Sequence, residues 1–118
     1  MTAAEIVQSY NDAVGRGDFK AARKFLQDDL SFQGPLDTFN RAEDFLAAIQ
    51  RLAGIVEAVD VKKMFVDGDD VCVLYDMKSK AGTSFIAEWF RIRGGRIASI
   101  RVVFDARSFV ALQSKASD

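Results

Sequence analysis

Hydrophobic and polar positions follow a helical period in the first half of the chain and a strand period in the second half. Apolar residues recur three or four positions apart in three early segments, which predicts three short amphipathic helices. Leu30–Gln33 is typical of a brief strand between the second and third helices, and Gly34-Pro35 ends it. The expected order is therefore helix, helix, short strand, helix, before the period changes to two.

Capping patterns mark the starts of these helices, and glycines follow two of them. We expect the second helix to hold the Phe25-Leu26 pair. The starts are Thr2-x-x-Glu5, Asp18 and Asn40-x-x-Glu43, and the ends of the first and third helices lie near Gly15 and Gly54.

Beyond Gly54, alternating apolar residues and short glycine-containing turns predict an antiparallel meander. Ser108–Lys115 is typical of a C-terminal helical turn. The fold class is α+β, with the helices packed on one side of the sheet. The predicted strands are Glu57–Val66, Val71–Lys80, Ser84–Arg93 and Arg96–Asp105.

Composition limits the classes of partner. The 118 residues suit one domain, 1–118, and a net charge of −1 gives no electrostatic footprint for nucleic acid or an anionic membrane. No apolar run approaches membrane-spanning length. The single Cys72 fits a reducing compartment, and the N-terminus carries neither a basic leader nor an apolar signal core. We therefore expect a cytoplasmic protein.

Missing residue types narrow the chemistry further. The chain has no histidine, which removes the commonest general base and metal ligand. One cysteine cannot build a zinc site, and no glycine-rich nucleotide motif occurs. A metal held by carboxylates alone is the alternative, but the acidic residues show no EF-hand spacing. We therefore expect no metal and no cofactor, and any catalysis has to use Asp, Glu, Tyr, Lys or Arg.

Glu88 interrupts an apolar strand face. Side chains alternate along a strand, so Ile86, Glu88, Phe90 and Ile92 share one face. A carboxylate there is costly unless it is paired, hydrogen-bonded or protonated. Pairing with Arg101 across the hairpin is an alternative, although the alternation directs Arg101 to the other face.

Large apolar side chains occupy both faces of the strands Val71–Lys80 and Ser84–Arg93. Three short helices can cover only one face of the sheet, so the other face needs a partner. The simplest partner is a second copy of the chain. We therefore expect a homodimer formed through the sheet face opposite the helices, with Phe85 and Trp89 near the interface.

Three segments resemble the nuclear transport factor 2-like superfamily, within it the SnoaL-like and ketosteroid isomerase-like proteins. They are EIVQSYNDAVGRGDF, KFLQDDLSFQGP and AEWFRIRGGRIASIRVVFD. The resemblance spans nearly the whole chain. It implies a cone-shaped curved antiparallel sheet wrapped around about three N-terminal helices, with an apolar pocket open at one end. The fold hosts isomerases, dehydratases, hydrolases, cyclases and non-catalytic binders.

The isomerase branch implies roles for individual residues. Tyr10 matches a helix tyrosine and Glu88 matches a protonated acid, which together bind an enolate oxygen. A core role for Tyr10 remains the alternative. The general base of that branch corresponds to Gly34, so it is missing. Asp76 could move the proton from within the pocket or could lie on the surface.

The epoxide-hydrolase branch fits less well, because two of its three polar residues correspond to Val102 and Leu74. Asp105 resembles an acid common at the end of the last strand, but the alternation of that strand favours a rim or structural role. We expect one apolar cavity with Tyr10 and Glu88 as its polar groups. Its predicted lining residues are Phe32, Phe45, Ile49, Ile86, Phe90, Ile100, Val102 and Phe104.

These residues favour a SnoaL-like protein that binds a small apolar molecule, of the carbonyl, phenolic, polyketide-like or steroid-like kind. It would polarise the ligand oxygen and could catalyse proton transfer as an isomerase, dehydratase or cyclase. The alternative is a non-catalytic dimeric module for ligand binding or protein interaction. The loss of the base at Gly34 favours binding over turnover.

Overall fold

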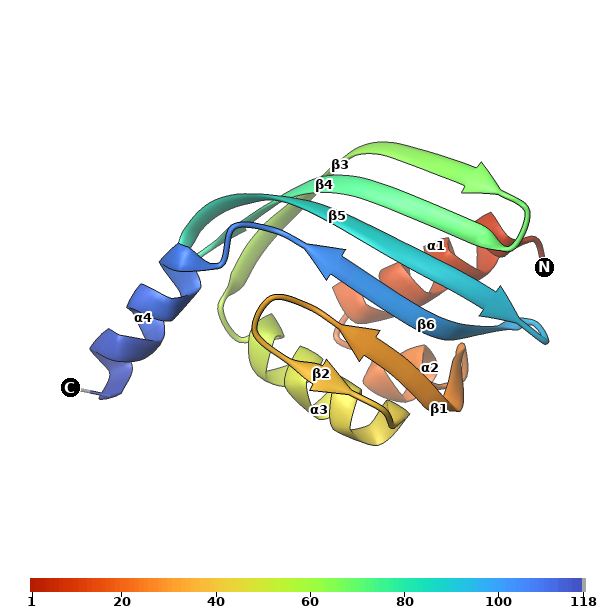
Figure 1. Ribbon diagram of the computed structural model, residues 1–118, viewed down its shortest axis with the longest axis horizontal. Helices are drawn as coiled ribbons and strands as arrows, with labels where there is room; N and C mark the ends of the chain where they lie inside the picture. Colours follow the sequence, from red (N-terminus) through yellow and green to blue (C-terminus); the bar gives the residue numbers. More distant parts are fainter. Residues whose placement is uncertain (118) are drawn as a thin grey trace.

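The computed structural model describes residues 1–117 and forms an open, curved, six-stranded sheet with helices inside the curve (Figure 1). The predicted α+β class is confirmed. The helices are α1 (Ala3–Gly15), α2 (Phe19–Arg23), α3 (Ala42–Ala53) and α4 (Arg107–Ser117). The strands are β1 (Leu26–Gln33), β2 (Thr38–Phe39), β3 (Val56–Asp67), β4 (Asp70–Ser79), β5 (Gly82–Arg93) and β6 (Arg96–Val103).

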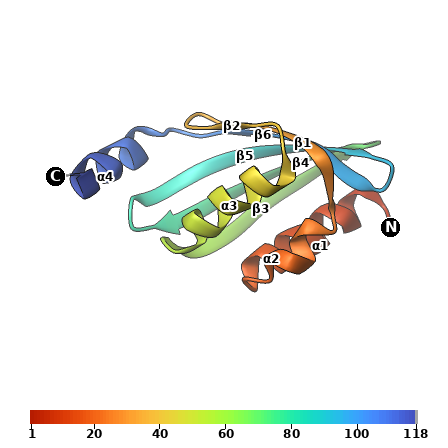
Figure 2. The same ribbon diagram turned by 90° about the horizontal axis from the view of Figure 1, so that it is seen from below.

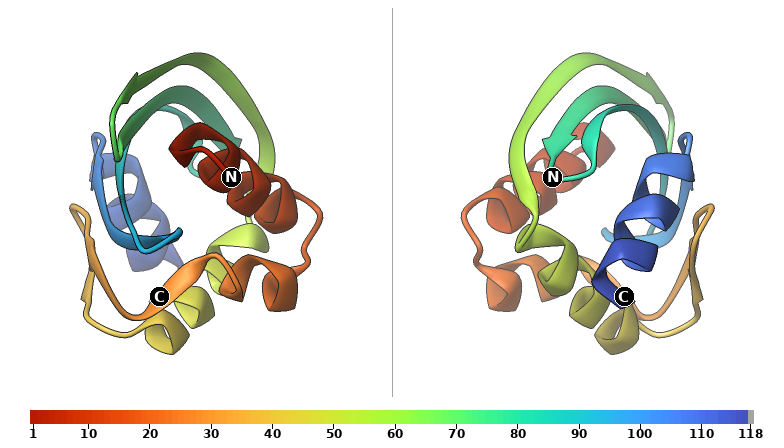
Figure 3. Two further views of the ribbon diagram at one scale, coloured as in Figure 1. Left: turned by 90° about the vertical axis from the view of Figure 1, so that its right-hand side faces the viewer. Right: turned by 90° about the vertical axis from the view of Figure 1, so that its left-hand side faces the viewer.

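The strand order is β2-β1-β6-β5-β4-β3, and β3 to β6 form the predicted antiparallel meander. β1 joins this meander as a parallel neighbour of β6, and β2 forms a short antiparallel hairpin with β1. Register shifts occur in β3 and β6, and bulges of this kind increase the local bend of a sheet. Seen end-on, the sheet arches around the helices (Figure 3).

Helices α1, α2 and α3 lie on the concave side of the sheet, whereas α4 lies beyond one end of it (Figure 2). Their apolar residues and the inner residues of the strands make one main core. A second, smaller cluster joins the strands to α4 through Met77, Ile86 and Phe109. No helix among residues 1–117 is long and apolar enough to cross a membrane.

Two of the three predicted helix caps form. Thr2 and Glu5 make both bonds of the capping box, and the Asp18 side chain accepts from the Ala21 N–H. The capping box at Asn40 was wrong, because α3 starts after Arg41 without a side-chain cap. The Glu43 carboxylate, which that box requires, instead accepts a hydrogen bond from Arg23 Nε at 2.8 Å.

The strand predicted at Leu30–Gln33 is longer than expected. It begins at Leu26, because Leu26 pairs with Ile97 of β6 and the Phe25 carbonyl accepts from the Ile97 N–H. The Phe25-Leu26 pair therefore lies outside α2, contrary to the prediction. Parallel pairing with a strand some seventy residues away leaves no local pattern in the sequence.

The convex face of the sheet exposes an apolar patch, which we call the outer patch. Its members come from four neighbouring strands, and the register places them side by side on the face away from the helices. Phe85 and Trp89, which the sequence analysis placed at an interface, belong to it. The outer patch consists of the exposed residues Phe65, Phe85, Trp89 and Val103, with half-buried Leu74 among them.

Candidate ligand-binding site

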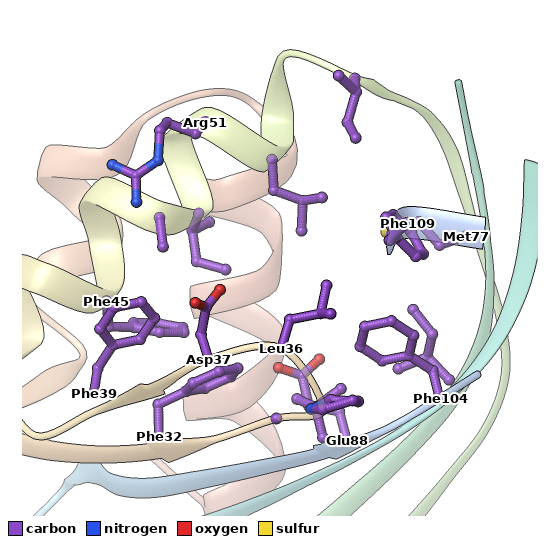
Figure 4. Close-up of a pocket in the computed structure, with 18 of the residues that line it drawn as sticks. Phe32, Leu36, Asp37, Phe39, Phe45, Arg51, Met77, Glu88, Phe104 and Phe109 are labelled. Atoms are coloured by element: carbon purple, nitrogen blue, oxygen red, sulfur yellow. The ribbon is translucent and has the colours of Figure 1, made fainter. Parts of the chain in front are cut away.

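A cavity of about 390 Å³ lies between α3, the β1–β2 hairpin, the inner sheet face and α4 (Figure 4). Its volume lies within the range usual for small-molecule pockets. Most lining side chains are aliphatic or aromatic, and the polar ones are few. The charged or titratable groups on its wall are Asp37, Arg51, Tyr75 and Glu88.

Helix α3 supplies one wall through residues spaced three or four apart. Phe45, Ala48, Ile49 and Leu52 recur on the face that the helix turns to the sheet. The ring of Phe45 packs 4.9 Å from the ring of Phe32 on β1, measured between centroids. The helical period of α3 thus places an apolar wall opposite the strands.

Glu88 enters the cavity from β5, on the inner face of the sheet between buried Ile86 and Phe90. The Tyr75 hydroxyl, on β4, donates a hydrogen bond to Glu88 Oε1 at 3.0 Å. Strand register explains the contact: Tyr75 lies opposite Ile86 and Val73 opposite Glu88, so Tyr75 and Glu88 are diagonal neighbours.

Burial among apolar side chains raises the pKa of Glu88 from 4.5 to about 7, although the hydrogen bond from Tyr75 acts in the opposite direction. Burial also raises the pKa of Tyr75, and the nearby Glu88 charge raises it further. Tyr75 therefore stays protonated at neutral pH, while a large share of Glu88 is neutral. A neutral carboxyl group can donate a hydrogen bond to a ligand oxygen.

Six of the eight predicted lining residues lie on this cavity: Phe32, Phe45, Ile49, Ile86, Val102 and Phe104. Phe90 and Ile100 share the inner sheet face but do not line it. Both are fully buried in the main core under α1. The alternation of β5 and β6 identified the correct face, but it could not tell which part of that face stays uncovered.

Tyr10 is buried in the main core, edge-on to Phe90 with ring centroids 6.1 Å apart. It does not line the cavity, and the side-chain hydrogen bonds found in residues 1–117 include none from Tyr10 to Glu88. The tyrosine at the carboxyl group is Tyr75. Tyr75 alternates along β4 with Val71, Val73 and Met77, which are buried on the inner face. This alternation in the sequence could have indicated that Tyr75 shares the inner face with Glu88.

Asp76 lies on the convex face of β4, outside the cavity, where its carboxylate is 3.7 Å from Lys62 Nζ. Asp105 precedes α4 and accepts a hydrogen bond from the Arg107 backbone N–H, and its bonds from Arg107 lower its pKa to about 2. Of the acidic residues considered from the sequence, Glu88 is thus the one on the cavity wall.

Asp37, Arg51, Met77 and Phe109 line the cavity and were not among the residues chosen from the sequence. Met77 and Phe109 belong to the apolar cluster beside α4, where the Phe109 ring lies 5.3 Å from that of Phe104. Asp37 follows Pro35 and Leu36 in the turn of the β1–β2 hairpin. In the part of the chain that the structure describes, no three acidic or thiol side chains gather as a metal site would require.

The curved sheet, the enclosed helices and the apolar cavity define a small pocket protein of the nuclear transport factor 2-like fold. The chain belongs to the SnoaL-like domain family, whose model matches residues 7–100. No curated protein matches the chain. The resemblance inferred from the three sequence segments is thereby confirmed for family and fold.

Solved structures agree on the fold. A nuclear transport factor 2-like protein of unknown function from Cytophaga hutchinsonii is 27% identical, with a TM-score of 0.85 over 93% of this chain and 96% of that one. An LEH-like epoxide hydrolase from M. tuberculosis is 21% identical, with a TM-score of 0.74 and 96% coverage of each chain. A candidate SnoaL-like polyketide cyclase from Shewanella denitrificans is 15% identical, with a TM-score of 0.76 over 95% and 97%.

Proposed function

We propose that this protein binds a small apolar molecule through a carbonyl or phenolic oxygen that accepts a hydrogen bond from neutral Glu88. The ligand would be of a polyketide-like or steroid-like size and polarity. The observation that carries the proposal is the pairing of Tyr75 with Glu88 at 3.0 Å on an otherwise apolar cavity wall. Tyr75 would hold one carboxyl oxygen, which leaves the other to face the ligand.

Polarising the ligand oxygen would also favour proton transfer at a neighbouring carbon. On this basis the protein would act as a cofactor-independent isomerase, dehydratase or cyclase. The relatives support this class only in general terms, since the fold serves several chemistries. Tyr10 would contribute through packing, and Asp76 would take no direct part.

Binding of 2-acetylnaphthalene tests the proposal, because its carbonyl oxygen can only accept a hydrogen bond. Its affinity should fall as pH rises through about 7, since ionised Glu88 cannot donate. Glu88→Gln should keep the binding and remove this pH dependence, because an amide still donates. Glu88→Leu should weaken binding at least tenfold below pH 7. Naphthalene, which lacks the oxygen, should bind all three proteins alike.

A second proposal concerns assembly: the outer patch would bury itself against a second copy of this chain. Patches of large apolar side chains on a soluble protein commonly mark such surfaces. Charges of both signs border the outer patch, among them Lys63, Arg101, Asp60 and Asp76, so two copies facing each other could pair opposite charges. A non-catalytic dimeric binder remains the alternative function, and it would use the same surface.

A further inference from the structure

A second hollow adjoins the cavity between the β1–β2 hairpin and α3, and we call it the side hollow. Its volume is about 360 Å³, close to that of the cavity. Phe39 and Arg51 line both spaces, so the two meet at these side chains. Figure 4 shows Phe39 and Arg51 at the end of the cavity away from Phe104 and Phe109. The side hollow is lined by Thr38, Phe39, Asn40, Asp44, Ala47 and Arg51.

Helix α3 turns a different stripe of side chains to each space. Its apolar stripe lines the cavity, as described above. Asp44, Ala47 and Arg51 are three and four positions apart, so they form an adjacent stripe that lines the side hollow. Ala47 lies between the two polar residues, and its single methyl group leaves the space beside the helix open. The opposite wall of the side hollow comes from β2 and the residue after it, Asn40.

The side hollow differs from the cavity in polarity. In the cavity, Tyr75 and Glu88 already bond to each other. In the side hollow, four polar side chains are exposed, and among residues 1–112 no side-chain hydrogen bond or ion pair engages any of them. Their hydrogen-bonding groups are therefore available to a ligand. These side chains are Thr38, Asn40, Asp44 and Arg51.

The four side chains offer both kinds of hydrogen-bonding partner. The Asp44 carboxyl oxygens accept and the Arg51 guanidinium donates, while the Asn40 amide and the Thr38 hydroxyl do both. A ligand group that only accepts would leave the acceptors of the hollow unused, and one that only donates would leave Arg51 unused. A hydroxyl group donates and accepts, so neighbouring hydroxyl groups match this mixed lining.

We propose that the ligand of this protein carries neighbouring hydroxyl groups on a substituent that lies in the side hollow while its apolar body fills the cavity. The inference rests on the proposed function, in which Glu88 holds the oxygen of the apolar body. It adds the chemical class of the other end of the ligand. Arg51, which lines both spaces, marks the junction between the apolar body and the hydroxylated end.

Two ketones of equal length test the proposal: 6-propoxy-2-acetylnaphthalene and its analogue with a 2,3-dihydroxypropoxy group in place of propoxy. They differ only in two hydroxyl groups, at the end opposite the carbonyl group. The wild-type protein should bind the diol more tightly than the propyl ether, by roughly fivefold or more. Asp44→Ala should remove most of this preference, because it removes the hydrogen-bond acceptor that α3 supplies.

Ala47→Leu tests the location of the hydroxylated end. The larger side chain fills space between Asp44 and Arg51, so it should also remove most of the preference for the diol. The same variant should bind 2-acetylnaphthalene as the wild type does, because this ketone has no substituent to place in the side hollow. Gln50→Leu is the matched control: it adds a leucine at an exposed position of α3 outside both spaces and should retain the preference.

Affinity for 2-acetylnaphthalene separates this inference from the proposed function. A wild-type protein that binds 2-acetylnaphthalene, but binds the diol no more tightly than the propyl ether, overturns the inference and leaves the proposed function standing. A preference for the diol that Asp44→Ala or Ala47→Leu retains in full also overturns it, as does loss of the preference in Gln50→Leu. No binding of 2-acetylnaphthalene by the wild type contradicts the proposed function itself.

Discussion

The Tyr75 side chain lies diagonally across the β4–β5 pair from Glu88 and donates its hydroxyl proton to Oε1 at 3.0 Å. This contact joins the one carboxyl group on the inner sheet face of the cavity to a phenol that stays protonated. It engages Oε1 and not Oε2, the oxygen that our proposal assigns to a ligand. The contact therefore opposes the effect of burial on the pKa of Glu88.

Removing the Tyr75 hydroxyl should raise the pKa of Glu88 further. The bond from Tyr75 is what lowers this pKa against burial, so Tyr75→Phe should move the Glu88 titration above about 7. A hydrogen bond to a charged group is stronger than a neutral one by about 1 kcal/mol, so the rise should be about one pH unit or less. Carboxyl ¹³C NMR titration measures it. Tyr10→Phe is the matched control, and an equal shift there would favour the Tyr10 partnership inferred from the sequence.

Glu88 should make the protein less stable as pH rises. Its pKa is 4.5 ordinarily and about 7 in the fold, so between these values the folded state holds a proton that the unfolded chain has released. The free energy of unfolding should therefore fall through this window, by at most roughly 3 kcal/mol. Urea unfolding from pH 4 to 8 measures the fall.

Glu88→Gln is the control for this pH effect, because an amide does not titrate. Its stability should change less than that of the wild type across the same window. Glu88→Leu removes the buried polar group, so above pH 7 this variant should be more stable than the wild type. The gain in stability is reduced by the cost of leaving the Tyr75 hydroxyl without its acceptor. A Glu88 titration near pH 4 in the folded protein would contradict the entire electrostatic account of the cavity.

Periodicity along single strands predicted the face of Glu88 and most of the cavity wall, because alternation is a local property. It could not identify Tyr75 as the partner, since that contact depends on the register between β4 and β5. Asp37 escaped notice for a related reason. The β2 strand that orients it is two residues long and carries no pattern of its own. Of the three predicted helix caps, only the one at Asn40 was wrong, because Arg23, twenty residues away, donates a hydrogen bond to the Glu43 carboxylate.

Filling the cavity should abolish binding without unfolding the protein. Ile49 of α3 lines the cavity, so Ile49→Trp adds volume on the cavity wall. We expect 2-acetylnaphthalene affinity to fall more than tenfold while the melting temperature changes by only a few degrees. Gln50→Trp, on the exposed side of the same helix, should retain the affinity. Equal binding by both variants would mean that the ligand sits elsewhere.

Assembly through the outer patch gives the last prediction. Val103 is 70% exposed and Phe85 57% exposed on the convex face, where neither helix nor strand covers them. A stable dimer buries about 800 Å² on each partner, so charges placed inside such an interface should be costly. Phe85→Glu and Val103→Glu should each convert a dimer into a monomer, as measured by light scattering at tens of micromolar.

Val110→Glu provides the control for this experiment, because Val110 is also exposed but lies on α4, away from the sheet. It should remain dimeric. The monomeric variants should still bind 2-acetylnaphthalene, since the outer patch and the cavity lie on opposite faces of the sheet and share no residue. A wild-type protein that is monomeric at these concentrations would contradict self-association, and the outer patch would then need a different partner.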